Sequence, residues 1–165
     1  MNQPPKSSAC PPFRPTVVGC VGRDPRLSAM LAECCTAALY AFSAHTYRSL
    51  LCESAAPVLS ELFETLAMEA AEQLRAFGRL KLAVGGNPAP RCQLRVLPHP
   101  LPLRDHRCQV TEQLCREAIR DAKALIDICQ TVMGKTQDRV VRSFLAAVLS
   151  DLQRQVERLA HASAE

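Results

Sequence analysis

Proline is confined almost entirely to two clusters, and this distribution constrains the fold more than any other feature of the chain. Six of the twelve prolines lie in residues 1–25, five lie in residues 88–102, and only Pro57 lies elsewhere. Because proline inside a helix removes a backbone donor and clashes with the preceding turn, the clusters indicate non-helical segments. The remaining stretches are rich in Ala, Leu, Glu, Gln and Arg, which are good helix formers. They predict four helices, over residues 25–53, 57–85, 110–134 and 138–162.

Apolar residues recur at intervals of three and four in each predicted helix, as expected of a helix that buries one face. No segment shows the alternation of apolar and polar residues that is typical of a strand, so the pattern favours an all-α fold. The helix over residues 25–53 is apolar over an especially wide arc. This arc offers surface for association with a protein partner or with a second copy of the chain, as in a homodimer.

Local signals explain where the predicted helices begin and end. Asp24 is expected to cap the first helix, and Ser54 is expected to cap the second, because their side-chain oxygens can accept hydrogen bonds from the first turn. The Gly85–Gly86 pair is expected to end the second helix and Gly134 the third, since glycine tolerates the left-handed conformation that closes a helix.

The lengths of the links predict the topology. Short links join the first helix to the second and the third to the fourth, which favours two antiparallel hairpins. The segment between the hairpins, about residues 86–109, is long enough at ~3.3 Å per residue to cross the whole bundle. Two hairpins joined by one long crossover form a ferritin-like bundle. We therefore expect an extended or disordered N-terminal segment over residues 1–24 and a ferritin-like four-helix bundle over residues 25–165.

Two stretches of the chain resemble a known family. The segment 61–88 reads ELFETLAMEAAEQLRAFGRLKLAVGGNP, and the segment 21–26 reads VGRDPR. They are similar to the second helix, and to the entry to the first helix, of small bacterial ferritin-like proteins related to rubrerythrins and manganese catalases. The resemblance extends from about Pro12 onward. It implies a four-helix bundle whose centre holds two iron or manganese ions.

In that superfamily two helices each supply a Glu-x-x-His pair to the metal ions. The resemblance places the pair of the second helix on Ala70 and Gln73, and the pair of the fourth helix on Leu152 and Gln155. Neither pair keeps a carboxylate or an imidazole, so these are degenerate ligand positions. Gln73 and Gln155 lie within apolar stripes, and we expect them to bond to each other or to a buried water.

The other two helices of the superfamily each supply one carboxylate. In the third helix this ligand falls on Asp121. In the first helix two alignments remain open, one placing the ligand on Ala41 and the other on Glu33. A conventional di-metal centre is therefore not expected.

A rearranged metal site is the alternative. Glu69 and Glu72 lie one position away from the expected register, and together with Glu33 and Asp121 they would form a carboxylate site for iron or manganese. The plainer interpretation is that Glu69 and Glu72 lie on the solvated face of their helix, because a shift of one residue rotates a side chain by about 100°.

The predicted crossover contains two cysteines and two histidines. Cys92, His99, His106 and Cys108 could together bind zinc in a tetrahedral site. Their spacing is irregular and no C-x-x-C motif is present, which favours incidental residues in a surface segment.

Nine cysteines, an odd number, indicate free thiols in a reducing compartment. Five of them lie in the predicted helices, where core packing explains them better than copper(I) storage, since none is followed by another at the third or fourth position. No run of about 18 uncharged apolar residues is present, so no membrane span is expected. The N-terminus lacks the apolar stretch of a secretory signal. We expect a cytoplasmic protein.

Positive charge is concentrated in the two proline-rich segments. Residues 1–26 and 89–108 each carry a net charge of +3, whereas the whole chain carries +4. Phe13 is the only aromatic residue there that could stack on a base, so we expect no binding to nucleic acid.

No phosphate-binding glycine loop, nucleophile elbow or other catalytic motif is present. The sequence therefore predicts a bundle that has lost its di-metal centre and acts as a non-enzymatic association or structural module without a cofactor. The alternative is a metal-dependent oxidoreductase of rubrerythrin or manganese-catalase type.

Overall fold

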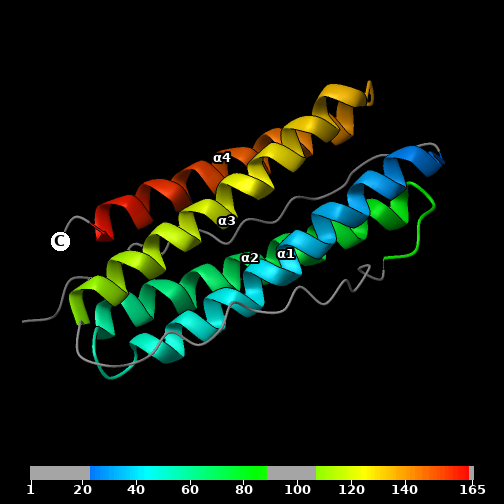
Figure 1. The fold of residues 1–165 in the computed structure, drawn as a ribbon. Helices are drawn as coiled ribbons and strands as arrows, with labels where there is room; N and C mark the ends of the chain where they lie inside the picture. Colours follow the sequence, from blue (N-terminus) through cyan, green and yellow to red (C-terminus); the bar gives the residue numbers. More distant parts are fainter. Residues whose placement is uncertain (1–22, 89–106, 164–165) are drawn as a thin grey trace, which may run out of the picture.

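Four helices make up nearly all of the described structure. A computed structural model of the protein describes residues 23–88 and 107–163. The helices are α1 (Pro25–Cys52), α2 (Pro57–Ala83), α3 (Arg107–Lys135) and α4 (Arg139–Ala162), and the described residues contain no strand. They lie side by side in an elongated bundle (Figure 1). The predicted all-α four-helix architecture is confirmed, and each predicted boundary lies within three residues of the observed one.

Two aspartates cap helices with their side chains. Asp24 accepts hydrogen bonds from two backbone N–H groups in the first turn of α1, at 2.9 and 3.0 Å, as predicted. Asp138 caps α4 in the same way, at 2.8 and 3.0 Å. The prediction that Ser54 caps α2 is wrong, because α2 begins after Ala56, which has no side-chain cap. Residues 53–55 are needed for the reversal of the chain, which is closed by a 2.8 Å bond from the Ala56 N–H to the Cys52 carbonyl.

Glycine has different roles at the ends of α2 and α3. Gly85 follows α2 with a φ of 80°, the left-handed conformation that the sequence predicted there. Gly134 does not end α3, which continues to Lys135.

The contacts at both ends of α1 define how it lies against α2. The backbone N–H of Asp24, before α1, donates to the carbonyl of Val84, after α2, at 3.3 Å. Near the other end of α1, the hydroxyls of Ser49 and Ser60 lie 3.2 Å apart. The first turn of α1 therefore lies beside the last turn of α2, and its last turns lie beside the start of α2.

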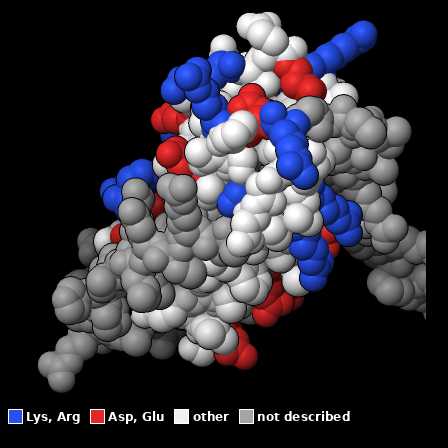
Figure 2. Space-filling view, turned by 90° about the vertical axis from the view of Figure 1, so that its right-hand side faces the viewer, with Lys and Arg blue, Asp and Glu red and all other residues white. Residues whose placement is uncertain are grey.

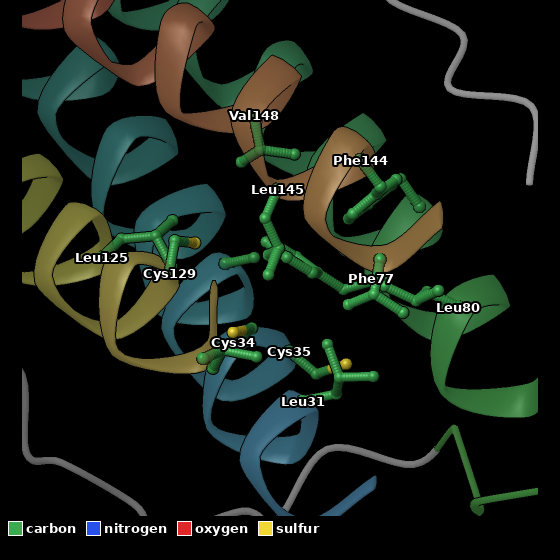
Figure 3. Close-up of a cluster of buried hydrophobic side chains, with 14 of the residues drawn as sticks. Leu31, Cys34, Cys35, Phe77, Leu80, Leu125, Cys129, Phe144, Leu145 and Val148 are labelled. Carbon is green, nitrogen blue, oxygen red and sulfur yellow. The ribbon is translucent and has the colours of Figure 1, made fainter. Parts of the chain in front are cut away.

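The buried apolar side chains form two separate clusters. In the larger cluster, side chains from all four helices meet (Figure 3). Phe77 and Phe144 pack there edge to face, with ring centroids 5.6 Å apart. The smaller cluster lies toward the end of α1 and the start of α2, and it is built around Phe63, Leu66 and Leu159.

Candidate functional site

A layer of buried polar side chains separates the two apolar clusters. On every helix, these residues lie between a stretch that belongs to the larger cluster and one that belongs to the smaller. We call them the polar layer; its members are His45, Arg48, Gln73, Asp121 and Gln155. Such groups are costly to bury without partners. The polar layer is therefore the candidate functional site within the core.

The strongest interaction in the polar layer joins α1 to α3. The Arg48 Nη2 atom donates to the Asp121 Oδ2 atom at 2.5 Å, and the two side chains are only 5% and 12% exposed. Burial, followed by the nearby negative charge of Asp121, raises the pKa of Tyr40. The Arg48 Nη1 atom is buried and has no hydrogen-bond partner among the described residues. Arg48 therefore neutralises the charge of the Asp121 carboxylate at the centre of the bundle.

His45 lies one turn before Arg48 on the same face of α1. Its ring stacks on Phe63 with centroids 6.0 Å apart, and its buried Nδ1 atom has no partner in the part of the chain that the structure describes. Burial and then the positive charge of Arg48 lower the pKa of His45 to about 3. The imidazole is therefore neutral at physiological pH.

On the other side of the bundle, the polar layer joins α4 to α2. The Gln155 amide donates to Glu69 at 2.9 Å, and the Arg158 guanidinium lies 2.5 Å from the same carboxylate oxygen. Gln73 and Gln155 were expected to bond to each other or to a buried water; the bond found for Gln155 is the one to Glu69. Glu69 itself is partly buried, with 37% of its side chain exposed, so it is not on a purely solvated face.

The four carboxylates of the predicted rearranged metal site do not converge. Glu33 is exposed on α1. Glu72 pairs along the surface of α2 with Arg75, while Glu69 and Asp121 have their separate partners on α4 and α1. In residues 23–88 and 107–163, no three His, Cys, Asp or Glu side chains are grouped to bind a metal ion.

The degenerate positions add no donor set that would fit two metal ions. Ala70 and Leu152 are buried and apolar, and Ala41 is partly buried. A metal ion beside Asp121 would also meet the guanidinium of Arg48, and two cations at such short range in a buried site repel strongly. The residues described here therefore do not fit a di-iron or di-manganese centre of the superfamily type.

The predicted zinc ligands lie outside the description. Residues 92, 99 and 106 are not described, and of Cys108, in the first turn of α3, the side chain is not described. The zinc site stays a prediction.

Arg48 is a member of the polar layer that the sequence did not reveal. A lone arginine in the wide apolar arc of α1 was the available signal, since it lies three residues after His45 on a buried face. Its partner lies 73 residues away in the chain, and no local pattern connects the two.

The outer face of α1 is uncharged and partly apolar. The helix has no Lys, Arg, Asp or Glu between Glu33 and Arg48. Phe42, Tyr47 and Leu50 are exposed, at 37%, 36% and 64%. The hydroxyls of Ser43 and Thr46, which are also exposed, donate to carbonyls of their own helix, so this face has few free polar groups. We call it the α1 outer face; it consists of Leu39, Phe42, Ser43, Thr46, Tyr47 and Leu50.

α1 is also the one described helix that is long and apolar enough to cross a membrane, by length and composition alone. This differs from the expectation that the chain has no such segment, which required a run free of charges. In the bundle, 39% of the most apolar 18-residue window of α1 is buried. The buried side of α1 also carries Arg48, which pairs with Asp121 of α3.

Charges of both signs mingle on the surface. Figure 2, which views the bundle from the right-hand side of Figure 1, shows Lys and Arg beside Asp and Glu among the described residues of that face. Among the described residues, three ion pairs each lie within a single helix: Glu72–Arg75, Glu112–Arg116 and Asp151–Arg154. No protein-family model matches the chain, and no curated protein matches it significantly.

Proposed function

We propose that this protein is a ferritin-like bundle in which an ion pair has replaced the di-metal centre, and that it acts by association with protein rather than by catalysis. The observation that carries the proposal is the buried contact between Arg48 and Asp121. Asp121 is the one core carboxylate that the family resemblance places at a ligand position, and a guanidinium already neutralises it. The rubrerythrin or manganese-catalase alternative would require Glu69, Glu72 and Asp121 to leave their cationic partners, and it is disfavoured for that reason.

The contacts between helices support a ferritin-like topology of two antiparallel hairpins. The end of α2 lies beside the start of α1, through the bond between Asp24 and Val84. The middle of α3 lies beside the second half of α1, through Arg48 and Asp121. The end of α2 and the start of α3 are therefore separated by much of the length of α1, which is about 42 Å long at ~1.5 Å per residue. The 23 residues between α2 and α3 can extend over about 75 Å.

The partner that best suits the α1 outer face is a second copy of the chain. A two-fold interface brings the same surface of both copies together, so a charged surface would meet its own charge. The α1 outer face has no charge, and it exposes Phe42, Tyr47 and Leu50, so it can pair with itself without repulsion. The proposal includes a cytoplasmic location for the protein, because the buried cysteines of the described core are free thiols.

Sedimentation velocity with two matched variants tests the association. Leu50 and Met68 are both 64% exposed, but Met68 lies on α2 with Glu64 and Glu72 one turn before and after it. We expect the wild-type chain to sediment as a dimer at micromolar concentration, Leu50→Glu to sediment as a monomer, and Met68→Glu to remain dimeric. A wild-type chain that stays monomeric at all concentrations, or equal disruption by both variants, would contradict the proposal.

A further inference from the structure

The cysteines of the described core are distributed very unevenly. All five are free and buried, and all lie on α1 or α3. None lies on α2 or α4 in the described residues, although these helices have buried positions as well. The five are Cys34, Cys35 and Cys52 on α1, and Cys115 and Cys129 on α3.

Four of these thiols occur as two pairs, each with one member on α1 and one on α3 in the same apolar cluster. Cys34 and Cys129 both belong to the larger cluster and project into it from their two helices (Figure 3), and the Cys129 thiol is the main cause of the raised pKa of Cys34. Cys52 and Cys115 both belong to the smaller cluster, close enough for Cys115 to raise the pKa of Cys52. The ion pair of the polar layer lies between the two cysteine pairs.

Cys35 differs from its neighbour Cys34. It is equally buried, but after burial the main influence on its pKa is Lys81 of α2, which lowers it. Among the described residues, Cys34 and Cys35 therefore have different surroundings: a thiol of α3 acts on the first, and an ammonium group of α2 acts on the second.

We propose that Cys34 and Cys129 are a site of oxidative modification, at which a disulfide forms between α1 and α3. A disulfide requires the two sulfurs to approach to about 2.05 Å, and both side chains already project into one apolar cluster from neighbouring helices. The bond would join the first hairpin to the second, which in the reduced protein are held together by packing and by the polar layer. This inference does not depend on the proposed association.

The chemistry requires a two-electron oxidant, for which hydrogen peroxide suffices. Cys34 loses its proton and attacks one peroxide oxygen, which breaks the O–O bond and gives a sulfenic acid and water. The Cys129 sulfur then attacks the sulfenic sulfur, the S–S bond forms, and the hydroxyl leaves as a second water. Two thiols and one peroxide thus become one disulfide and two waters.

The surroundings of the pair determine the rate. The neighbouring Cys129 thiol and burial both raise the pKa of Cys34, so the thiol stays protonated in the closed bundle, whereas the thiolate is the reactive form. Oxidation is therefore slow in the folded protein and proceeds through local opening of the helix contact. Once formed, the disulfide is shielded from reductants by the same cluster.

Peptide mapping of the oxidised full-length chain tests the proposal. After treatment with hydrogen peroxide and alkylation of the remaining thiols, tryptic digestion releases residues 27–48 and 124–135 as separate peptides. We expect these two peptides to be joined, with a mass about 2 Da below their sum. A Cys129 peptide that remains unlinked while the peroxide is consumed, or that carries only sulfinic or sulfonic acid, would overturn the proposal.

Two variants assign the bridge within the first peptide, which contains both Cys34 and Cys35. Cys34→Ala should abolish the joined peptides, and Cys35→Ala should leave them intact. If Cys34→Ala does not fold, Cys129→Ala provides the same test from α3, read as loss of any bridge from residues 27–48 to α3. Bridging that survives Cys34→Ala and disappears in Cys35→Ala would also overturn the assignment.

Discussion

The guanidinium of Arg48 lies 2.5 Å from the carboxylate of Asp121, and this ion pair joins α1 to α3 between the two apolar clusters. Both groups are almost completely buried, so each depends on the other for compensation of its charge. A buried pair of this kind contributes little net stability compared with apolar residues of the same size. Its effect is to place a cation, the Arg48 guanidinium, beside the Asp121 carboxylate at the centre of the bundle.

Removal of one partner should be far more damaging than removal of both. In Arg48→Met, Asp121 is left buried without its cation, and we expect a loss of about 3–5 kcal/mol in the free energy of unfolding. Urea denaturation followed by circular dichroism measures this loss.

The matched control is the double variant Arg48→Met/Asp121→Leu. It replaces both charges by apolar groups, so most of the loss should be recovered. A double variant that is no more stable than Arg48→Met would mean that the two residues do not act as a pair.

His45 should make the protein less stable in mild acid. Its pKa is about 3 in the folded protein, compared with 6.5 for an unperturbed histidine, so the unfolded chain binds the proton more readily. Stability from the neutral imidazole is complete above pH 6.5, falls by about 1.4 kcal/mol per pH unit below it, and is exhausted near pH 3. Urea denaturation at pH 7, 6 and 5 should show this slope.

His45→Phe is the control for this pH dependence, because it keeps a ring against Phe63 and cannot bind a proton. The difference in slope between the wild type and His45→Phe isolates the contribution of His45 from that of the carboxylates. Identical slopes for both chains would contradict a buried neutral imidazole.

Two glycines should respond in opposite directions to the same substitution. Gly134 lies inside α3 with open space where a Cβ atom would be added, so Gly134→Ala should raise the free energy of unfolding by about 0.5–1 kcal/mol. Gly85 has a φ of 80°, and a Cβ atom there would lie 2.9 Å from the Arg23 side chain, so Gly85→Ala should lower it by about 1 kcal/mol or more. Thermal unfolding of both variants decides whether the signs differ.

The cap of α4 provides a further prediction. Asp138→Ala removes two hydrogen bonds to the first turn and should cost about 1 kcal/mol. Ser54→Ala is the control, because Ser54 does not cap α2 and is exposed. Chemical denaturation should separate the two variants, and an equal loss in both would disprove the assigned caps.

The sequence was sufficient to predict what depends on neighbouring residues. The proline clusters and the three-and-four spacing predicted four helices, and Asp24 capped α1 as expected, since each signal acts within a few residues. The Ser54 cap failed because the length of a turn depends on how α1 and α2 pack.

The polar layer was only partly predictable. Gln155 is recognisable in the sequence as a polar residue within an apolar stripe, and the family resemblance points to Asp121, but their partners Glu69 and Arg48 lie on other helices. The same holds for the pairing of Cys34 with Cys129, which requires the register of α1 against α3. Contacts between residues so far apart in the chain follow from packing, and no local pattern specifies them.

The most direct test of the central claim is the metal content of the protein. If the ion pair has replaced the metal centre, protein purified from medium supplemented with iron and manganese should contain far less than one equivalent of either metal per chain, and Glu69→Ala should leave this value unchanged. About two equivalents per chain, the content of a di-metal bundle, that are lost in Glu69→Ala would contradict the claim.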